Sequence, residues 1–224
     1  MAPFARFARA TGDAIGRADM NRGITKPGLG VAAGNVLLAL MYILFISAHL
    51  QSFTKTPRLS LLLIVSVETV CLIFVLIRKD PDETWHSWQT WVTTLGGTFA
   101  PLLFRPTLAP ADLLAGHIIQ GAALMLVIAA LLSLNRSFGL LPAHRGVKSD
   151  GLYRWIRHPL YTAYALAWIG YVVNNFDLYN VVILLAAIGL EILRIVNEET
   201  LLLRYQAYAV YAQRTRWRLI PLLW

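Results

Sequence analysis

The sequence predicts an all-α polytopic membrane helical bundle of about six spans, followed by a cytoplasmic C-terminal amphipathic helix. Hydrophobic residues make up 57% of the 224 residues and charged residues only 14%, whereas roughly 25% of the residues in a soluble domain are charged. The mean hydropathy is +0.57. Several apolar runs also reach the length of about 20 residues that a helix needs to cross a bilayer. These three observations argue against a soluble fold.

Five apolar runs are predicted as spans, and a sixth is added on composition. The five are residues 31–50, 59–77, 111–134, 160–173 and 178–196. The sixth, residues 85–104, is rich in threonine and glycine, which suits helices that pack closely through small residues and local hydroxyl bonds. A re-entrant or interfacial segment is the alternative for this stretch.

The distribution of Lys and Arg predicts that both termini are cytoplasmic, because cations accumulate on that side in short loops. With six spans, the outer loops hold only Lys55, Arg58 and Arg105. The inner segments hold Arg6, Arg9, Arg17, Arg22, Lys26, Arg78, Lys79, Arg136, Arg145, Lys148, Arg154, Arg157, Arg204, Arg214, Arg216 and Arg218. Omitting the span at 85–104 would place the later charged loop opposite the N-terminus, so the asymmetry supports keeping it.

Three regions follow along the chain. Residues 1–30 are predicted as a cytoplasmic arm, residues 31–134 as the first four spans, and residues 135–224 as a cytoplasmic loop, a helical hairpin and a final helix.

The net charge of +8 does not indicate a nucleic-acid partner, because the basic residues are scattered between apolar runs. The single cysteine, Cys71, lies in an apolar run and allows no intrachain disulfide. The spacing of His and Cys suggests no metal site.

A first polar cluster precedes the span at 160–173. Asp150-Gly151 is a turn signal, and Pro159 suits the first turn of a helix. Arg157 and His158 therefore lie just before a helix N-terminus, where free N–H groups and partial positive charge favour an anion such as a carboxylate or phosphate. The alternative is that the cations of this cluster only set topology and touch lipid headgroups.

A second cluster follows the last span. On a continuing helix, Arg194 and Glu198 share a face at i, i+4 and can pair, whereas Glu199 points elsewhere. Acids beside the helix-start anion site would suit a ligand that carries both an amine and a carboxylate. An interfacial ion pair is the alternative. Within the spans, Glu68 and the pair His117 and Gln120 are expected to be structural, bonded to neighbouring helices; a functional role is the alternative.

Together, the two clusters resemble the isoprenylcysteine carboxyl methyltransferase and phospholipid methyltransferase superfamily. The resemblance covers roughly residues 135–224. It lies in Gly151-Leu-Tyr153, Arg157-His158-Pro159-Leu-Tyr161, Glu198-Glu199-x-x-Leu202, Tyr205-x-x-Tyr208 and Leu219-Ile220-Pro221.

The resemblance implies a methyltransferase core at 135–224 that uses S-adenosylmethionine and no metal, with its active site on the cytoplasmic side. It places Arg194 and Glu199 as catalytic residues beside the methyl acceptor, a hydrophobic or lipid-linked molecule that enters from the membrane lipid. With the helix-start anion site, the expected donor-binding residues are Tyr153, Arg157, His158, Pro159, Tyr161 and Glu198.

Two other functions are compatible with this pattern. One is an NADPH-dependent membrane reductase of the sterol-reductase type, whose C-terminal region also carries an arginine-histidine box. The chain has the RHPLY form and an adjacent acid pair instead, and no evident cation set for a 2′-phosphate. The other is a non-enzymatic membrane protein that keeps the scaffold, for which loss of the boxes is expected. Both boxes are intact here.

Overall fold

The computed structural model describes residues 29–77, 83–84, 88–107, 112–134, 143–144 and 147–222. The chain forms two compact units, Met1–Leu37 and Leu38–Trp224. Most of the predicted arm at 1–30 lies outside the described residues, as do Arg78, Lys79, Arg136 and Arg145. The division at residues 30 and 134 stays a prediction.

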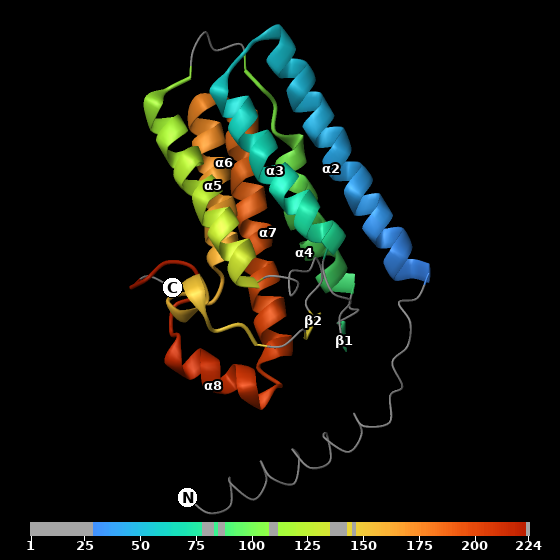
Figure 1. The fold of residues 1–224 in the computed structure, drawn as a ribbon, viewed down its shortest axis with the longest axis vertical. Helices are drawn as coiled ribbons and strands as arrows, with labels where there is room; N and C mark the ends of the chain where they lie inside the picture. The colour runs from blue at the N-terminus through green and yellow to red at the C-terminus, as the bar shows by residue number, and fades with distance from the viewer. Residues whose placement is uncertain are drawn as a thin grey trace, which may run out of the picture. The chain divides into compact units, whose positions relative to one another are not determined.

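The described chain is helical apart from one short strand pair (Figure 1). The strands β1 (Glu83–Thr84) and β2 (Ala143–His144) pair antiparallel. The helical elements are α2 (Leu29–Lys55), α3 (Leu59–Ile77), α4 (Trp88–Phe99), the 3₁₀ helix η1 (Ala100–Leu103), α5 (Leu114–Leu134), the 3₁₀ helix η3 (Gly151–Arg154), α6 (Pro159–Asn174), α7 (Leu178–Leu202) and α8 (Gln206–Arg214).

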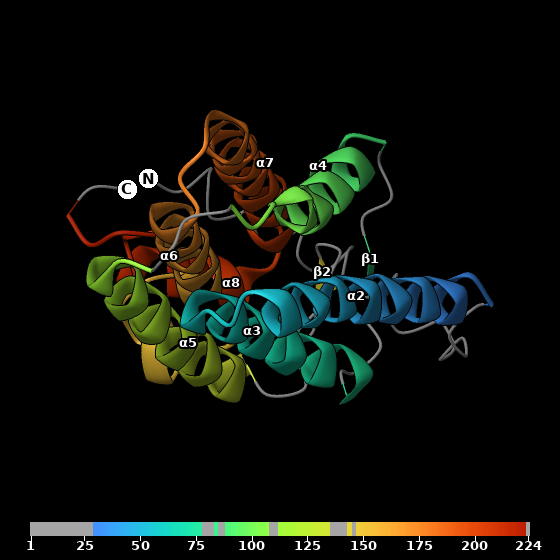
Figure 2. The same cartoon turned by 90° about the horizontal axis from the view of Figure 1, so that it is seen from above.

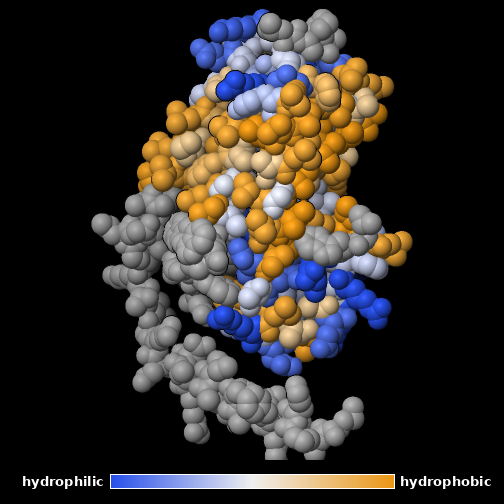
Figure 3. Space-filling view, turned by 180° about the vertical axis from the view of Figure 1, so that it is seen from behind, coloured by the Kyte–Doolittle hydropathy of each residue, from blue (hydrophilic) through white to orange (hydrophobic). Residues whose placement is uncertain are grey.

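Four of the described helices are long and apolar enough to cross a membrane. They are Val36–Lys55, Leu59–Ile77, Leu114–Leu134 and Leu178–Leu202. Leucine and methionine side chains point outward on all four: Leu44, Leu76, Met125 and Leu185 are each at least 62% exposed. Figure 3 shows a broad apolar surface with hydrophilic residues at both ends. An apolar surface of this extent is expected to face lipid.

The two remaining predicted spans form shorter helices. α6 has 16 residues and is therefore about 24 Å long, against a hydrocarbon core of about 30 Å. α4 has 12 residues and continues as η1, with Pro101 near the start of the 3₁₀ turn. In the described part of this segment the α-helix thus ends before Pro101, because proline has no N–H to donate to the preceding turn. The total of six crossings stays a prediction.

The tightest packing lies between α5 and α6, where glycines bring the two helices together. A Cβ on Gly170 would lie 2.7 Å from Cγ of Gln120 and 2.9 Å from its backbone nitrogen. A Cβ on Gly116 would lie 2.4 Å from Oδ1 of Asn174. One apolar core cluster, which includes Val127 and Ala163, fills the space between α3, α5 and α6. This packing fixes α6, which carries one side of the candidate site.

The second side of the site comes from α7 and the chain after it. α7 packs along α4, and the two helices lie beside each other in Figure 2. It continues to Leu202, beyond the predicted end at residue 196, so Glu198 and Glu199 lie on the helix. α8 is a helix, as predicted, and its Tyr208 and Tyr211 are buried against the protein. Those two phenols dock α8 on the rest of the fold.

Candidate active site

The site begins with a turn that directs the chain into α6. Gly151 has φ of +60°, and a Cβ there would lie 2.4 Å from Oγ of Ser133 on α5. Only glycine fits this backbone comfortably at such a close approach, so the predicted Asp150-Gly151 turn is confirmed. Pro159 is the first residue of α6, as expected, and His158 is its N-cap.

The C-terminal segment lies directly on this helix start. The N–H of Arg157 donates to the carbonyl of Trp217 at 2.8 Å, and the N–H of His158 donates to the carbonyl of Arg218 at 2.9 Å. Within α6, the hydroxyl of Thr162 donates to the carbonyl of Leu219 at 2.9 Å. The chain after α8 therefore covers the start of α6 through three hydrogen bonds.

α8 is anchored to the same region. The hydroxyl of Tyr211 donates to the carbonyl of Tyr153 in η3 at 2.6 Å. Burial raises the pKa of Tyr211 to about 12. Burial, with a further contribution from the Glu198 carboxylate, raises the pKa of Tyr153 well above its usual value. Both phenols are thus protonated at neutral pH and can act as hydrogen-bond donors.

Glu199 occupies the anion position that the sequence predicts at the start of α6. One carboxylate oxygen lies 2.9 Å from Nε of Arg157 and 3.2 Å from Nε2 of His158. The other accepts a hydrogen bond of 2.7 Å from Nε of Arg218. Because α7 continues past residue 196, the Glu199 carboxylate reaches the positively charged start of α6. Glu199 is 2% exposed, so it is bound on all sides by protein.

Glu198 points to a different neighbour, as its adjacent position on the helix requires. Its Oε2 accepts a hydrogen bond of 2.8 Å from the hydroxyl of Tyr161. The Tyr161 ring is stacked with the ring of His158 at a centroid distance of 5.5 Å. On the same ring, Cζ of Arg194 lies 5.1 Å from the centroid. The structure thus brings together His158, Tyr161, Arg194 and Glu198, all of which were predicted as site residues.

The sequence interpretation missed two members of this cluster, Glu191 and Arg218. Nη1 of Arg194 donates to Oε1 of Glu191 at 3.4 Å, and Glu191 is 6% exposed. An acid inside an apolar span is by itself a reason to expect function, and its position three residues before Arg194 could have identified it. Arg218 gave no such signal, because its contact with Glu199 depends on how the C-terminal segment folds back.

The cluster has groups that suit a positively charged ligand. Glu198 and the rings of His158 and Tyr161 suit a cation, whereas the Arg157 and His158 side chains are already paired with Glu199. Burial raises the pKa of Tyr208 well above its usual value, so its hydroxyl is a donor at neutral pH. That hydroxyl is buried without a hydrogen-bond partner among the described residues and is therefore a polar group that a ligand can use.

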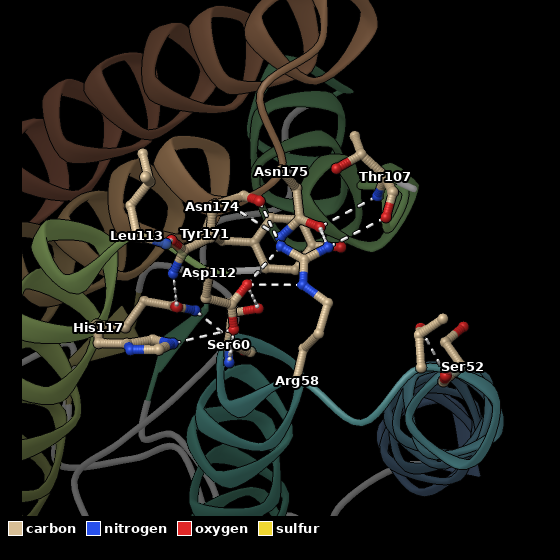
Figure 4. Close-up of polar contacts among 12 residues, drawn as sticks. Ser52, Arg58, Ser60, Thr107, Asp112, Leu113, His117, Tyr171, Asn174 and Asn175 are labelled. Carbon is tan, nitrogen blue, oxygen red and sulfur yellow. Dashed lines mark hydrogen bonds and ion pairs between the residues drawn. The ribbon is translucent and has the colours of Figure 1, made fainter. Parts of the chain in front are cut away.

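A separate polar network lies at the other end of α6 (Figure 4). Arg58 donates from Nε to Asp112 at 2.7 Å and from Nη1 to Oδ1 of Asn175 at 3.0 Å. Asp112 also accepts from the backbone and hydroxyl of Ser60 and lies 2.9 Å from Nε2 of His117. This network joins the starts of α3 and α5 to the connection between α6 and α7.

Gln120 extends the structural contacts at this end. It donates to the carbonyl of Ser60 at 3.2 Å and accepts a longer hydrogen bond of 3.4 Å from Asn174. Gln120 thus bonds to neighbouring helices, as expected, whereas His117 contacts Asp112, just before its own helix. Glu68 is buried on α3.

Residues 114–204 match the sequence model of the isoprenylcysteine carboxyl methyltransferase (ICMT) family. The match runs from α5 to the end of α7 and includes Arg157, His158, Arg194 and Glu199. No curated protein sequence matches the chain. The resemblance predicted from the two boxes is thereby confirmed for the matched segment.

Proposed function

From an ICMT-family domain at residues 114–204, we propose that the protein is an integral membrane methyltransferase that uses S-adenosylmethionine and acts on a lipid-like, membrane-embedded acceptor. One observation carries this proposal. His158, Tyr161, Arg194 and Glu198 come from two helices and form one partly buried group of aromatic rings and opposite charges at the start of α6.

The donor site is proposed on the residues around the start of α6. When bound, S-adenosylmethionine would supply a methyl group whose carbon an acceptor attacks in line, with the sulfonium sulfur as the leaving group. Catalysis of such a transfer requires mainly positioning and electrostatics. Glu198 and the rings of His158 and Tyr161 favour the positive groups of the donor. The residues proposed to hold it are Tyr153, Arg157, His158, Pro159, Tyr161 and Glu198.

Arg194 and Glu199 have different proposed roles beside the acceptor. Arg194 is held by Glu191 and lies over the ring of Tyr161, so it is the candidate catalytic residue that orients the acceptor. Glu199 contacts Arg157, His158 and Arg218. These contacts favour a role in positioning the helix start and the C-terminal cover.

The orientation in the membrane is part of the proposal. The Lys and Arg distribution supports cytoplasmic termini and an active site on the cytoplasmic side. An acceptor with a hydrophobic tail would reach the site laterally between helices, while the water-soluble donor would enter from the cytoplasm beneath the C-terminal segment.

Transfer of a labelled methyl group tests this function. The purified protein in lipid vesicles, given S-adenosylmethionine labelled in its methyl group and a total lipid extract, should move label into the organic phase. His158→Ala should reduce the rate at least tenfold, because it removes a ring that stacks with Tyr161 and contacts Glu199. Gln213→Ala, on an exposed position of α8, is the matched control and should transfer normally. Equal rates in His158→Ala and the wild type would contradict the proposed site.

A further inference from the structure

A pocket of about 290 Å³ lies between α2 and the chain around the end of η1. This volume is close to the lower end of the range of about 300–1,000 Å³ for pockets that bind small molecules. On one side, the lining residues recur at helical spacing along a single face of α2. They are Met41, Leu44, Phe45, Ala48, His49 and Ser52. At 1.5 Å per residue this face is about 16 Å long, so the pocket is a groove along the helix.

The floor of this groove is aromatic and apolar. Phe45, His49 and Phe104 line it and are each at most 5% exposed. The rings of Phe45 and His49 lie 4.1 Å apart, and the ring of Phe104 lies 5.4 Å from that of Tyr171. Nδ1 of His49 lies 3.2 Å from the carbonyl of Phe45, and Nε2 lies 3.4 Å from the hydroxyl of Tyr171. The polar atoms of His49 are thus satisfied within the protein, and the floor suits an apolar chain.

The groove opens on the apolar surface of the molecule. Leu44 and Ala48 line it and are both exposed. The helix that carries them, Val36–Lys55, is also the least buried of the four candidate spans. In a bilayer, lipid chains and not water surround such a surface. An acyl chain is therefore the group that has access to this groove from the side.

Arg105 lines the same groove and supplies a positive charge. Its backbone N–H donates to Oδ1 of the buried Asn180 at 3.0 Å, and its carbonyl accepts from Nδ2 of Asn180 at 2.9 Å. Its guanidinium lies 4.1 Å from the centroid of the Tyr179 ring. It is exposed and forms no ion pair with any residue that the structure describes. The cation is thus held in place and is available to an anion.

The charges at this end of the bundle leave an excess of positive charge. The segments that join α2 to α3, η1 to α5 and α6 to α7, with the helix ends beside them, contain five charged residues and two histidines. These are Lys55, Arg58, Arg105, Asp112, Asp177, His49 and His117. Arg58 pairs with Asp112, so Lys55 and Arg105 remain against Asp177. Protonation of either histidine would only add positive charge. A ligand with a net negative charge is therefore favoured over a neutral one.

We propose that this groove binds an anionic phospholipid, with one acyl chain along α2 and the phosphate on Arg105. Basic pockets between transmembrane helices are suited to anionic head groups. The predicted topology places this lipid in the outer leaflet.

The proposed lipid is distinct from the methyl acceptor. The groove adjoins Tyr179 and Asn180 at the start of α7, whereas His158 lies at the opposite end of α6, beside the end of α7. The inference therefore goes beyond the proposed methyltransferase function and does not depend on it.

Native mass spectrometry of the detergent-purified full chain tests the proposal. The protein is titrated with phosphatidylglycerol or phosphatidylcholine carrying the same acyl chains. The wild type should bind phosphatidylglycerol at least fivefold more tightly than phosphatidylcholine. Arg105→Ala should weaken the binding of phosphatidylglycerol about tenfold, as expected for loss of a charge-assisted hydrogen bond. Phosphatidylglycerol should also raise the unfolding temperature of the wild type more than that of Arg105→Ala, because a ligand of the folded state stabilises it.

Matched variants separate the charge from the groove. Lys55→Ala removes an exposed cation at the same end that does not line the groove, and its affinity should stay within about twofold because distant exposed charges are screened. Ala48→Phe places a ring in the groove and should weaken the binding of both lipids about tenfold. Ser47→Phe adds the same ring at the neighbouring exposed position outside the groove and should bind both lipids normally.

Four results would overturn the proposal. Equal affinity for phosphatidylglycerol in the wild type and Arg105→Ala would reject the head-group contact, and equal affinity in the wild type and Ala48→Phe would reject the acyl-chain position. Competition by glycerol 3-phosphate as strong as that by the whole lipid would indicate a site for a soluble anion. A dimer that excludes the lipid would indicate that a second copy of the chain covers the groove. None of these measurements uses S-adenosylmethionine, so failure of the proposed methyltransferase function would leave them unchanged.

Discussion

Asp112 is the carboxylate on which the polar network around Arg58 depends. It receives hydrogen bonds from Arg58 and Ser60 and contacts His117, and its side chain is 3% exposed. Burial raises its pKa, but the hydrogen bonds from His117, Ser60 and Arg58 outweigh burial, and the net pKa is lower than usual. The folded state therefore binds this proton more weakly than the unfolded state does. The resulting stabilisation is complete above the unfolded pKa near 3.8 and is lost as the pH falls through the folded pKa.

Asp112→Asn should lower the free energy of unfolding by about 3 kcal/mol, because it leaves the buried Arg58 charge without its counter-ion. The change can be followed by thermal unfolding in detergent at pH 7. Asp177→Asn is the matched control, since Asp177 is exposed at the same end and makes no side-chain cap hydrogen bond. Below about pH 4, the wild type should lose stability relative to Asp112→Asn. Equal unfolding temperatures for the two variants at pH 7 would contradict this account.

Individual site residues could be predicted where local sequence determines them. His158, Pro159 and Tyr161 were found because a helix start has its own signals, and Glu198 because it follows Arg194 at helical spacing. The contacts of Glu199 could not be derived in this way. They depend on the extra length of α7 and on Arg218, which lies after α8 in a segment that folds back onto α7. Long-range contacts of this kind have no local pattern in the sequence.

At the scale of elements, the crossing of α5 and α6 determines where the start of α6 lies. Gly170→Ala should disrupt this crossing, because its Cβ would meet the backbone nitrogen of Gln120 at 2.9 Å, and backbone atoms cannot move aside. The expected loss is about 2 kcal/mol or more, with weaker binding of S-adenosylmethionine. Thermal unfolding and ligand binding in detergent measure the two effects.

Gly121→Ala is the matched control on α5, because nothing lies within 4 Å of the added Cβ. Alanine favours a helix by up to about 1 kcal/mol over glycine, so this variant should be as stable as the wild type or more stable. If both alanine variants unfold at the wild-type temperature, the close approach of α5 and α6 is not a determinant of stability.

Some helices could be predicted from the sequence more accurately than others. The predicted span at 59–77 coincides with α3, because an uninterrupted apolar run leaves few alternatives. The segment at 85–104 was harder to predict. Its apolar character suggested a span, but the helix ends at Phe99 and passes into a 3₁₀ turn that contains Pro101. The paired glycines of α5 and α6 could not be matched from sequence, since their contact depends on tertiary packing.

At the scale of the whole molecule, α6 connects two polar ends. His158 lies at its N-terminal end in the candidate site, and Asn174 and Asn175 lie at its C-terminal end in the Arg58 network. The charge distribution predicts that the first end is cytoplasmic and the second external. The apolar surface between them (Figure 3) is consistent with a chain that crosses the bilayer.

Cysteine labelling tests this orientation. Ser149→Cys and Asp177→Cys place a thiol at an exposed position at each end of α6. The native Cys71 is 1% exposed and should give little background. An impermeant maleimide should label Asp177→Cys in intact cells and Ser149→Cys only in inverted vesicles. The reverse pattern would contradict the predicted topology, and labelling of both from one side would show that α6 does not cross the membrane.

The central claim is that the start of α6 and the end of α7 form a site for S-adenosylmethionine. Equilibrium binding of radiolabelled S-adenosylmethionine to the detergent-purified protein, with NADPH tested in parallel, measures it most directly. Binding should be saturable, and Glu198→Gln should weaken it at least tenfold, because it removes the carboxylate that accepts from Tyr161. NADPH should show no saturable binding. Saturable binding of NADPH without binding of S-adenosylmethionine would contradict the account and indicate a reductase.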